Sequence, residues 1–188
     1  MEFQDNKIIL DKELSVLDEF VLDFVNSLNI DYVLVSGYVS ILFGRSRGSE
    51  DIDMVIEPLD KAATLTFFDA LVVSGFECIN ESRETAFDCL SESVALRFAK
   101  KGSVIPNMEV KFAKSFASKA ALNNSVEVLL NNNVLKISPI ELQIVYKRLC
   151  LRSEKDLEDA RHLEIVFENH ISVEKINKYK ELLNHHGC

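Results

Sequence analysis

The chain has 188 residues, of which 47% are hydrophobic and 27% are charged, values typical of a compact globular protein with one sizeable core. Its 30 acidic and 21 basic residues give a formal charge of −9, which opposes unspecific binding to nucleic-acid backbones. No run reaches the roughly 18 apolar residues that a membrane span needs. The N-terminal segment carries acidic residues where a signal peptide would carry basic ones. We therefore expect a cytoplasmic protein without a membrane partner.

The first part of the chain alternates helices and strands. Apolar residues at helical spacing predict a long amphipathic helix. A short strand then ends in a Ser-Gly turn, a short helix follows, and a polar loop leads into a second strand. In chain order these five elements span residues 12–29, 31–37, 38–44, 45–50 and 51–57.

The middle of the chain is also mixed, and the end is helical. After a second helix that ends at Gly75, the pattern predicts a strand and then a hairpin that turns around Gly102 and Pro106. The segment around the three asparagines is predicted to be another short hairpin or a strand. From Pro139 onward the pattern is typical of helices alone. We predict an α/β (α+β) fold with a small mixed sheet flanked by helices, followed by a C-terminal helical bundle. The corresponding domains are residues 1–138 and 139–188.

Two aspartates open the strand over residues 51–57. Side chains alternate along a strand, so Asp51 and Asp53 share one face while the apolar residues beside them share the other. Burying an unpaired carboxylate is costly, so the pair lies at a solvated edge or holds a cation. Two carboxylates on a rigid strand suit Mg²⁺ or Mn²⁺, whose shell is completed by water and substrate phosphates. For the triplet alone, a solvated strand edge is the alternative.

A turn suited to an anion precedes these aspartates. Ser36 and Gly37 stand at a helix start, where free backbone N–H groups favour an anion and a missing side chain lets phosphate approach. Arg45 and Arg47 in the following loop can meet phosphate oxygens. We predict a phosphate cradle beside the cation site, the alternative being an ordinary turn and solvated arginines.

The segment SGYVSILFGRSRGSEDIDMVIE, residues 36–57, resembles the signature of the nucleotidyltransferase superfamily that includes DNA polymerase beta. In that superfamily a Gly-Ser or Gly-Gly turn and a helix precede a DxD strand. The turn holds a triphosphate and the two acids bind divalent metals. The resemblance implies these roles for Ser36 and Gly37, and for Asp51 and Asp53. The Ser-Gly order seen here departs from the usual pattern.

Such enzymes also need a third carboxylate from a later strand. The candidate is Glu109, which shares its strand face with Lys111, although the family more often has Asp at this position. A third acid would help hold the metal near the α-phosphate. An exposed Glu-Lys pair on a hairpin is the alternative.

The helical half carries a second resemblance. The segment YKRLCLRSEKDLEDARHL, residues 146–163, resembles the C-terminal helices of the AbiEii-like nucleotidyltransferases, known as toxins or antitoxins. Lys147 matches their helix lysine, and KDLED, residues 155–159, matches the R/K-D-x-x-D element that follows it. The resemblance implies that Lys147 neutralises triphosphate charge and that Asp156 orients a base or the acceptor, with Asp159 on the same helix face. A charged surface helix with salt bridges is the alternative.

The leading hypothesis is a metal-dependent nucleotidyltransferase that moves NMP from an NTP, such as ATP, to a hydroxyl acceptor and releases pyrophosphate. The acceptor is a protein, a tRNA end, which the net charge disfavours, or a small molecule, and a toxin or antitoxin partner follows from the resemblance. We assign catalytic roles to Asp51, Asp53, Glu109, Lys147 and Asp156, the first three as metal ligands. We assign nucleotide binding to Ser36, Gly37, Arg45, Arg47, Lys111 and Asp159.

Other functions stay open at this point. An inactive nucleotidyltransferase fold that binds a nucleotide or a partner is favoured by the Ser-Gly order and by glutamate as the third acid. A glycosyltransferase that holds a nucleotide sugar through DxD would need a larger domain before Asp51. RNA could still bind a local basic strip. Its residues would be Lys100, Lys101, Lys111, Lys114 and Lys119.

Overall fold

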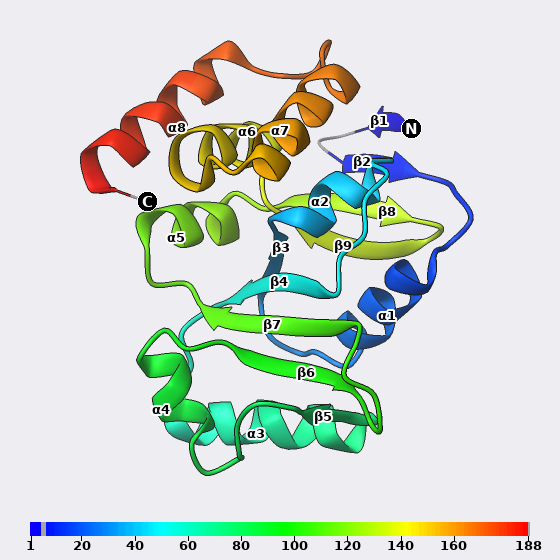
Figure 1. Cartoon of the computed structure of the whole chain (residues 1–188), viewed down its shortest axis with the longest axis vertical. Coiled ribbons are helices and arrows are strands. Elements are labelled where there is room, and N and C mark those ends of the chain that lie inside the picture. The colour runs from blue at the N-terminus through cyan, green and yellow to red at the C-terminus, as the bar shows by residue number, and fades with distance from the viewer. Residues whose placement is uncertain (5–6, 188) are drawn as a thin grey trace.

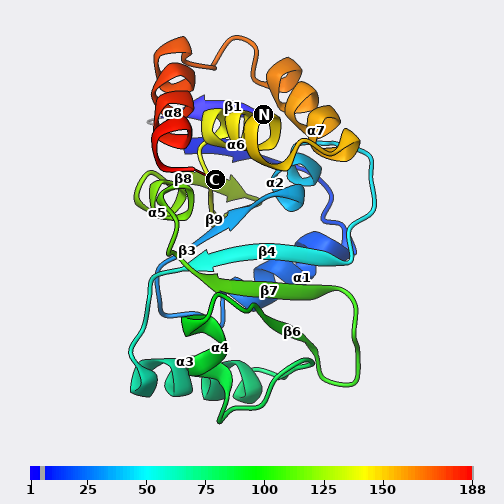
Figure 2. The same cartoon turned by 60° about the vertical axis from the view of Figure 1, so that its left-hand side comes forward.

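The computed structural model describes residues 1–4 and 7–187. In this part of the chain, nine strands form one mixed sheet in the order β1-β2-β8-β9-β3-β4-β7-β6-β5 (Figure 1). Helices α6, α7 and α8 gather at one end of the molecule, and α3 and α4 lie at the other (Figures 1 and 2). The mixed α/β fold class is confirmed.

The strands are short, and most have the β-branched and aliphatic composition that suits a buried sheet. Their bounds are β1 Glu2–Gln4, β2 Lys7–Leu10, β3 Tyr32–Val35, β4 Asp51–Ile56, β5 Phe76–Cys78, β6 Leu96–Lys100, β7 Asn107–Phe112, β8 Val126–Leu130 and β9 Asn133–Ile137. The predicted hairpin is confirmed, because β6 pairs antiparallel with β7. The segment predicted as a hairpin or a strand is a hairpin, because β8 pairs antiparallel with β9.

The helices flank this sheet, and a π-helical turn follows α6. Their bounds are α1 Val16–Val25, α2 Gly37–Leu42, α3 Lys61–Val73, α4 Ala86–Ser91, α5 Phe116–Asn123, α6 Ile140–Tyr146, the π-helical turn Lys147–Leu151, α7 Glu154–Val166 and α8 Val173–His186. Within the described residues, no helix is long and apolar enough to cross a membrane.

The first helix is shorter than the predicted span of 12–29. It begins after Ser15, whose side chain accepts from the backbone N–H of Asp18 while the Asp18 carboxylate accepts from the backbone N–H of Ser15. This reciprocal capping box fixes the helix start. The periodic apolar residues beyond the helix ends still pack against the core, which explains why the pattern predicted too long a helix.

Some elements were not predicted. The N-terminal strand β2 pairs parallel with β8, with Ile8 opposite Val128, so its formation depends on a partner far along the chain. Helix α5 was missed as well, although Ser115 caps it by accepting from the backbone N–H of Ser118.

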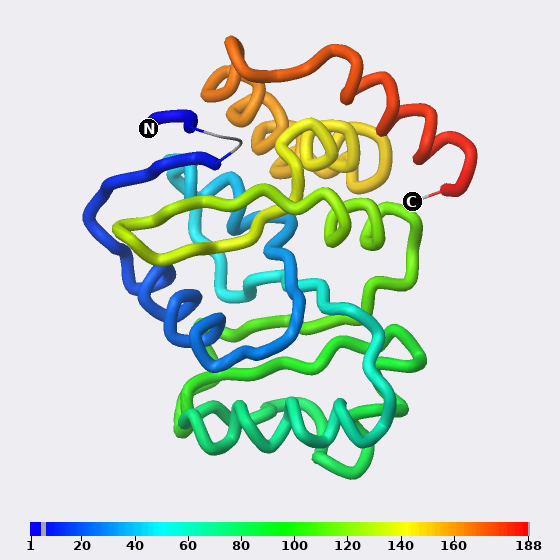
Figure 3. The backbone as a smooth tube through the Cα atoms, turned by 180° about the vertical axis from the view of Figure 1, so that it is seen from behind, coloured from blue at the N-terminus to red at the C-terminus, as the bar shows by residue number. Residues whose placement is uncertain are grey.

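In space, β1 and the end of α8 lie on opposite sides of the molecule (Figures 1 and 3).

Apolar residues pack on both faces of the sheet. The face that carries Ile52 and Met54 packs with α1 and α3 in one hydrophobic cluster. The face that carries Val33 and Val55 packs with α5, α6 and α8 in a second cluster. Helix α6 contributes to both clusters, and the division into residues 1–138 and 139–188 stays a prediction.

Candidate active site

The central strands bring acids from distant segments together. Strand β4 pairs parallel with β7, which places Asp53 opposite Glu109 and Asp51 opposite Asn107. Side chains at such paired positions point to the same face, so the predicted alternation of β4 and β7 agrees with the structure. The Asp51 residue is exposed, the Asp53 side chain is 28% exposed, and the Glu109 side chain is 10% exposed.

Two cations lie against these acids. The Lys111 ammonium lies 3.5 Å from Asp53 Oδ1 and 3.3 Å from Glu109 Oε2. On the neighbouring strand β6, the Arg97 guanidinium reaches Glu109 Oε1 at 2.5 Å. Glu109 is therefore neutralised from two sides, whereas Asp53 has Lys111 as its cationic neighbour.

The charges in this group shift one another's pKa values. Burial raises the pKa of Asp53; the positive charge of Lys111 opposes that rise and the negative charge of Glu109 adds to it. For Lys111, burial alone would lower the pKa, but the two carboxylates outweigh it and the pKa rises. Additional positive charge near Asp53 would therefore stabilise the charged form of its carboxylate.

The β3–α2 turn lies directly beside Asp53. Val35, the last residue of β3, pairs with Asp53, and Ser36 follows with a φ of 62°, in the left-handed region that non-glycine residues rarely adopt. The backbone N–H of Ser36 donates to Gln143 Oε1 of α6 at 3.1 Å. Such strained residues gather at ligand sites, so the conformation of Ser36 makes this corner a candidate ligand site.

An arginine covers the expected phosphate cradle at Gly37. A Cβ atom built on Gly37 would lie 1.7 Å from a terminal nitrogen of Arg47, so only glycine leaves room for that guanidinium. The predicted open approach of a phosphate to the Gly37 backbone is therefore not what the structure shows, because Arg47 already occupies this space. Its guanidinium also lies 3.6 Å from Asp159 Oδ1.

Lys147, Asp156 and Asp159 form a buried charge cluster behind Arg47. The Lys147 side chain is fully buried, and its ammonium lies 3.3 Å from Asp156 Oδ1 and 3.0 Å from Asp159 Oδ2. Arg45 lies 3.6 Å from Asp159 and also pairs with Glu158. This cluster fastens α7 and the π-helical turn to the loop that follows α2.

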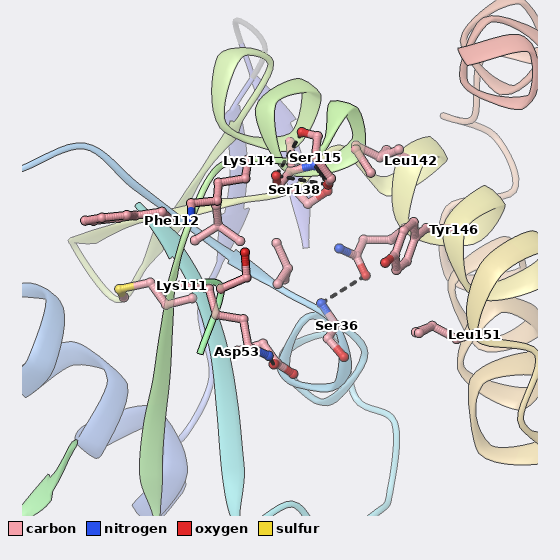
Figure 4. Close-up of a pocket in the computed structure, with 18 residues that line it drawn as sticks. Ser36, Asp53, Lys111, Phe112, Lys114, Ser115, Ser138, Leu142, Tyr146 and Leu151 are labelled. Atoms are coloured by element: carbon pink, nitrogen blue, oxygen red, sulfur yellow. Dashed lines mark hydrogen bonds and ion pairs between the residues drawn. The ribbon is translucent and has the colours of Figure 1, made fainter. Parts of the chain in front are cut away.

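A pocket of about 350 Å³ opens beside the acids. Its sheet wall comes from β3, β4 and β7, and its helical wall from α5, α6 and the π-helical turn. Ser36, Asp53 and Lys111 lie toward one side, and Tyr146 and Leu151 lie on the helices opposite (Figure 4). The pocket therefore joins the corner formed by Ser36 and Asp53 to the helical half of the chain.

Comparison with solved structures bears on this architecture. A crystal structure of an antigenic nucleotidyltransferase-like protein from Paracoccidioides brasiliensis is similar, with a TM-score of 0.52 and 17% sequence identity, covering 88% of this chain and 84% of that chain. The chain has a nucleotidyltransferase-like fold. No protein-family model matches the sequence, and no curated protein does.

On this nucleotidyltransferase-like fold, the predicted site residues fall into two groups. The first lies at or beside the pocket, and the second lies in the charge cluster, whose Arg47 also contacts Gly37. The first group is Ser36, Asp51, Asp53, Glu109 and Lys111, and the second is Arg45, Arg47, Lys147, Asp156 and Asp159. Among the described residues, no three acids, histidines or cysteines come together as a ready-made metal site.

The predicted basic strip is not continuous. Lys100 lies at one end of the β6–β7 pair, against Asp23, whereas Lys111 lies toward the other end, against Asp53 and Glu109. Both ammonium groups are thus held by carboxylates.

The hydrogen-bonding partner of Ser36, Gln143, was missed from the sequence, although it is a polar residue inside the apolar helix IELQIVY.

Proposed function

We propose that the chain is a metal-dependent nucleotidyltransferase that transfers NMP from an NTP to a hydroxyl acceptor and releases pyrophosphate. The observation that carries this proposal is the meeting of Asp53 with the strained Ser36 turn at the mouth of one pocket, with Glu109 and Lys111 alongside. The nucleotidyltransferase-like fold supports it.

The carboxylates of Asp51 and Asp53 are suitable ligands for a divalent ion. Both carboxylates project from the same face of one strand, and burial of Asp53 disfavours its charge unless a cation is near. When bound, Mg²⁺ or Mn²⁺ would polarise the α-phosphate and lower the pKa of the acceptor hydroxyl. Glu109 is engaged by Arg97 and Lys111, so we propose that it steadies Lys111 as well as adding negative charge to the site.

The remaining residues of the chain orient and neutralise the nucleotide. Lys111 supplies a positive charge at the pocket mouth, where it can meet a phosphate oxygen beside Asp53. Arg47 supplies a second positive charge at the start of α2. Because Lys147 is fully buried and held by Asp156 and Asp159, we propose that these three position Arg47 and do not touch the nucleotide.

The acceptor and biological role are also proposals. The resemblance to AbiEii-like nucleotidyltransferases suggests a toxin or antitoxin, with a protein, a tRNA end or a small molecule as the acceptor. The formal charge of −9 makes RNA the least favoured of these, because its phosphates would be repelled unless a local patch were available.

The experiment is incubation of the protein with each α-labelled NTP, Mg²⁺ and a lysate of the native host, followed by detection of any labelled macromolecule. Asp53→Ala and Asp51→Ala should reduce transfer to background. Glu57→Gln, an exposed acid directly after β4, is the matched control and should transfer as the unmodified protein does. Full transfer by Asp53→Ala would disprove the assignment.

A second candidate is a nucleotidyltransferase fold that binds a nucleotide or a partner without chemistry. Two observations favour it: Glu109 is already paired with Arg97 and Lys111, and Arg47 fills the space at Gly37. Calorimetry with NTP and Mg²⁺, run beside a pyrophosphate assay, separates the candidates. A binding module would release heat on nucleotide addition and no pyrophosphate over several hours.

A further inference from the structure

Glu109 is the acid of the site that the chain itself neutralises most fully. Its two oxygens have different cationic partners: the Arg97 guanidinium lies 2.5 Å from Oε1, and the Lys111 ammonium lies 3.3 Å from Oε2. The Glu109 side chain is 10% exposed, so these cations take the place of much of the water that a free carboxylate would hold. A metal ion bound at Glu109 would have to share it with two positive charges.

The Lys111 ammonium lies between two acids from neighbouring strands. It is 3.3 Å from Glu109 Oε2 and 3.5 Å from Asp53 Oδ1, and these two acids lie opposite each other on β7 and β4. Lys111 follows Glu109 by two positions, so both side chains leave the same face of β7. A lysine ammonium is a compact point charge. The chain thus places a positive charge of its own where an ion joining Asp53 to Glu109 would lie.

A divalent ion between Asp53 and Glu109 would meet like charge at this position. It would lie within a few ångströms of the Lys111 ammonium and close to Arg97, and repulsion over such distances is strong where burial lowers the dielectric constant. The described residues also hold no group of three acids close enough to form a metal cluster. Both observations separate Glu109 from the metal ligands.

Asp51 and Asp53 can hold one ion without Glu109. Asp51 is exposed and lies two positions before Asp53 on the same face of β4. Mg²⁺ commonly takes one or two protein carboxylates and completes its shell with water and substrate phosphates. Lys111 contacts Asp53 through Oδ1, so an ion beside Asp51 lies away from the ammonium if it binds the other oxygen of Asp53. A third acid is therefore not needed for this ion.

We propose that the site takes one divalent ion, at Asp51 and Asp53, and that Lys111 supplies the second positive charge in place of a second ion. Glu109 then holds Lys111 between the strands, and Arg97 holds Glu109. The inference deepens the proposed function and rests on it for the ion at Asp51 and Asp53. It gives Glu109 a positioning role in place of the metal-binding role that the sequence predicted.

The test counts Mn²⁺ ions on the whole chain. Mn²⁺ is titrated into the metal-free protein, bound ions are counted by equilibrium dialysis, and the bound state is examined by electron paramagnetic resonance. The unmodified protein should bind one Mn²⁺ per chain and give the spectrum of an isolated ion. Two bound ions per chain, or the spectrum of a spin-coupled pair, would overturn the proposal.

Variants at Lys111 test whether its charge excludes a second ion. Lys111→Met keeps a long side chain without charge, and Lys111→Ala also removes the stem. Both should bind two Mn²⁺ per chain, because Glu109 and Asp53 then lack the ammonium between them. Adding Glu109→Gln to either variant should return the count to one, and Glu109→Gln alone should keep it at one. A single ion in both Lys111 variants would show that Lys111 does not replace an ion.

Lys136→Met is the matched control for the change at Lys111. Lys136 also pairs with an aspartate, Asp31, and its side chain is 34% exposed against 43% for Lys111. It belongs to β9 and does not line the pocket beside Asp53. This variant should therefore bind one Mn²⁺ per chain, as the unmodified protein does.

NMP transfer provides a second measurement. At low Mn²⁺, Lys111→Met should transfer about 10-fold more slowly or worse, and high Mn²⁺ should restore much of the rate, because a second ion then replaces the ammonium. If transfer proceeds and the unmodified protein binds two ions, the inference fails while the proposed function stands. If one ion binds and the Lys111 variants bind two, but no transfer occurs, the function fails while the inference stands. If no Mn²⁺ binds, both fail.

Discussion

Asp18 is a buried carboxylate that the candidate site does not use. Its side chain is fully buried, and it accepts from Tyr38 Oη at 2.9 Å and from Ser15 Oγ at 2.7 Å while pairing with the Lys12 ammonium at 2.8 Å. Burial alone would raise the pKa of Asp18, but the bonds from Lys12, Ser15 and Tyr38 outweigh it and the pKa is lowered. The charged carboxylate therefore ties α1 to α2.

Asp18→Ala should lower the free energy of unfolding at pH 7 by about 3 kcal/mol, because it leaves Tyr38 and Lys12 without their partner. A carboxyl whose pKa is lower in the folded state stabilises above its unfolded pKa of about 3.9 and loses that effect as pH falls through the folded pKa. Urea unfolding should therefore give a smaller difference in unfolding free energy between the two proteins at pH 3 than at pH 7. Glu19→Ala, exposed on the same helix, is the control.

A close contact joins Gly37 and Arg47. The missing side chain of Gly37 makes room for the Arg47 guanidinium, which carries charge between the β3–α2 turn and Asp159. Gly37 stands at the start of α2, where alanine would favour the helix if space allowed. A side chain at position 37 is therefore excluded by one neighbouring residue, Arg47.

Gly37→Ala should lower stability by about 1 kcal/mol or more in the unmodified protein, since Arg47 must move away from Asp159. In an Arg47→Ala background the same change should be neutral or stabilising, because the space is then empty and alanine is the better helix former. A double-mutant cycle by thermal unfolding measures the coupling. Additive effects of the two changes would show that the steric link is absent.

Helix α7 is held through its charge cluster. Lys147, Asp156 and Asp159 lie at the junction of α7 with the π-helical turn, and the Ser153 side chain caps α7 by accepting from the backbone N–H of Asp156. Buried ion pairs of this kind add little net stability when complete, but breaking one leaves an uncompensated charge. The cluster therefore fixes the position of α7 more than it strengthens the fold.

Lys147→Met should lower the free energy of unfolding by about 3 kcal/mol, because Asp156 and Asp159 lose their buried ammonium. Arg148→Met is the matched control, since the neighbouring Arg148 pairs with Glu164 on the exposed surface, where ion pairs contribute below about 1 kcal/mol. Chemical denaturation of both variants provides the measurement. Equal losses would contradict a special role for the buried cluster.

Local patterns predicted the elements whose signals lie within one segment. The alternation in β4 and β7 gave the face of Asp53 and Glu109. The turn residues gave the β6–β7 hairpin and left the β8–β9 segment open as a hairpin or a strand. Strand β2 was missed because its partner β8 lies more than a hundred positions away, and pairing at that distance leaves no local mark. Element ends were also uncertain, since apolar periodicity continued past the capped ends of α1.

The site was predictable to a similar extent. The acids and the Ser-Gly turn were found from spacing and resemblance, and the structure places Ser36, Asp53 and Glu109 close together. Two features depended on tertiary contacts and could not be read from the sequence: Arg47 over Gly37, and the hydrogen bond of Gln143 to Ser36. Whether these residues perform the assigned roles stays a prediction.

For the whole molecule, the pocket is the place where sheet and helices meet. Its walls include the edge of the β4–β7 pair and α5 and α6, so a ligand there contacts both halves of the chain. Binding to the folded state alone stabilises it by about 2.7 kcal/mol when the ligand is at 100 times its dissociation constant. Both halves should share this stabilisation.

An NTP with Mg²⁺ should therefore slow amide hydrogen exchange in β4 and in α6 together, because one ligand bridges the two walls. Asp53→Asn should lose this protection, since it removes the charge that anchors the metal and triphosphate in the proposed function. Hydrogen exchange followed by mass spectrometry resolves both segments. Protection confined to β4, with α6 unchanged, would contradict binding across the pocket.

The bond between Ser36 and Gln143 spans 107 positions of sequence, and the contact of Asp53 with Lys111 spans 58. During translation, a nascent chain that has just completed β7 already contains Asp51, Asp53 and Glu109. It still lacks the pocket wall that α6 supplies. Closing such long loops is slow and entropically costly. Truncated products that stop before α6 would therefore carry the acids without an enclosed place for a nucleotide.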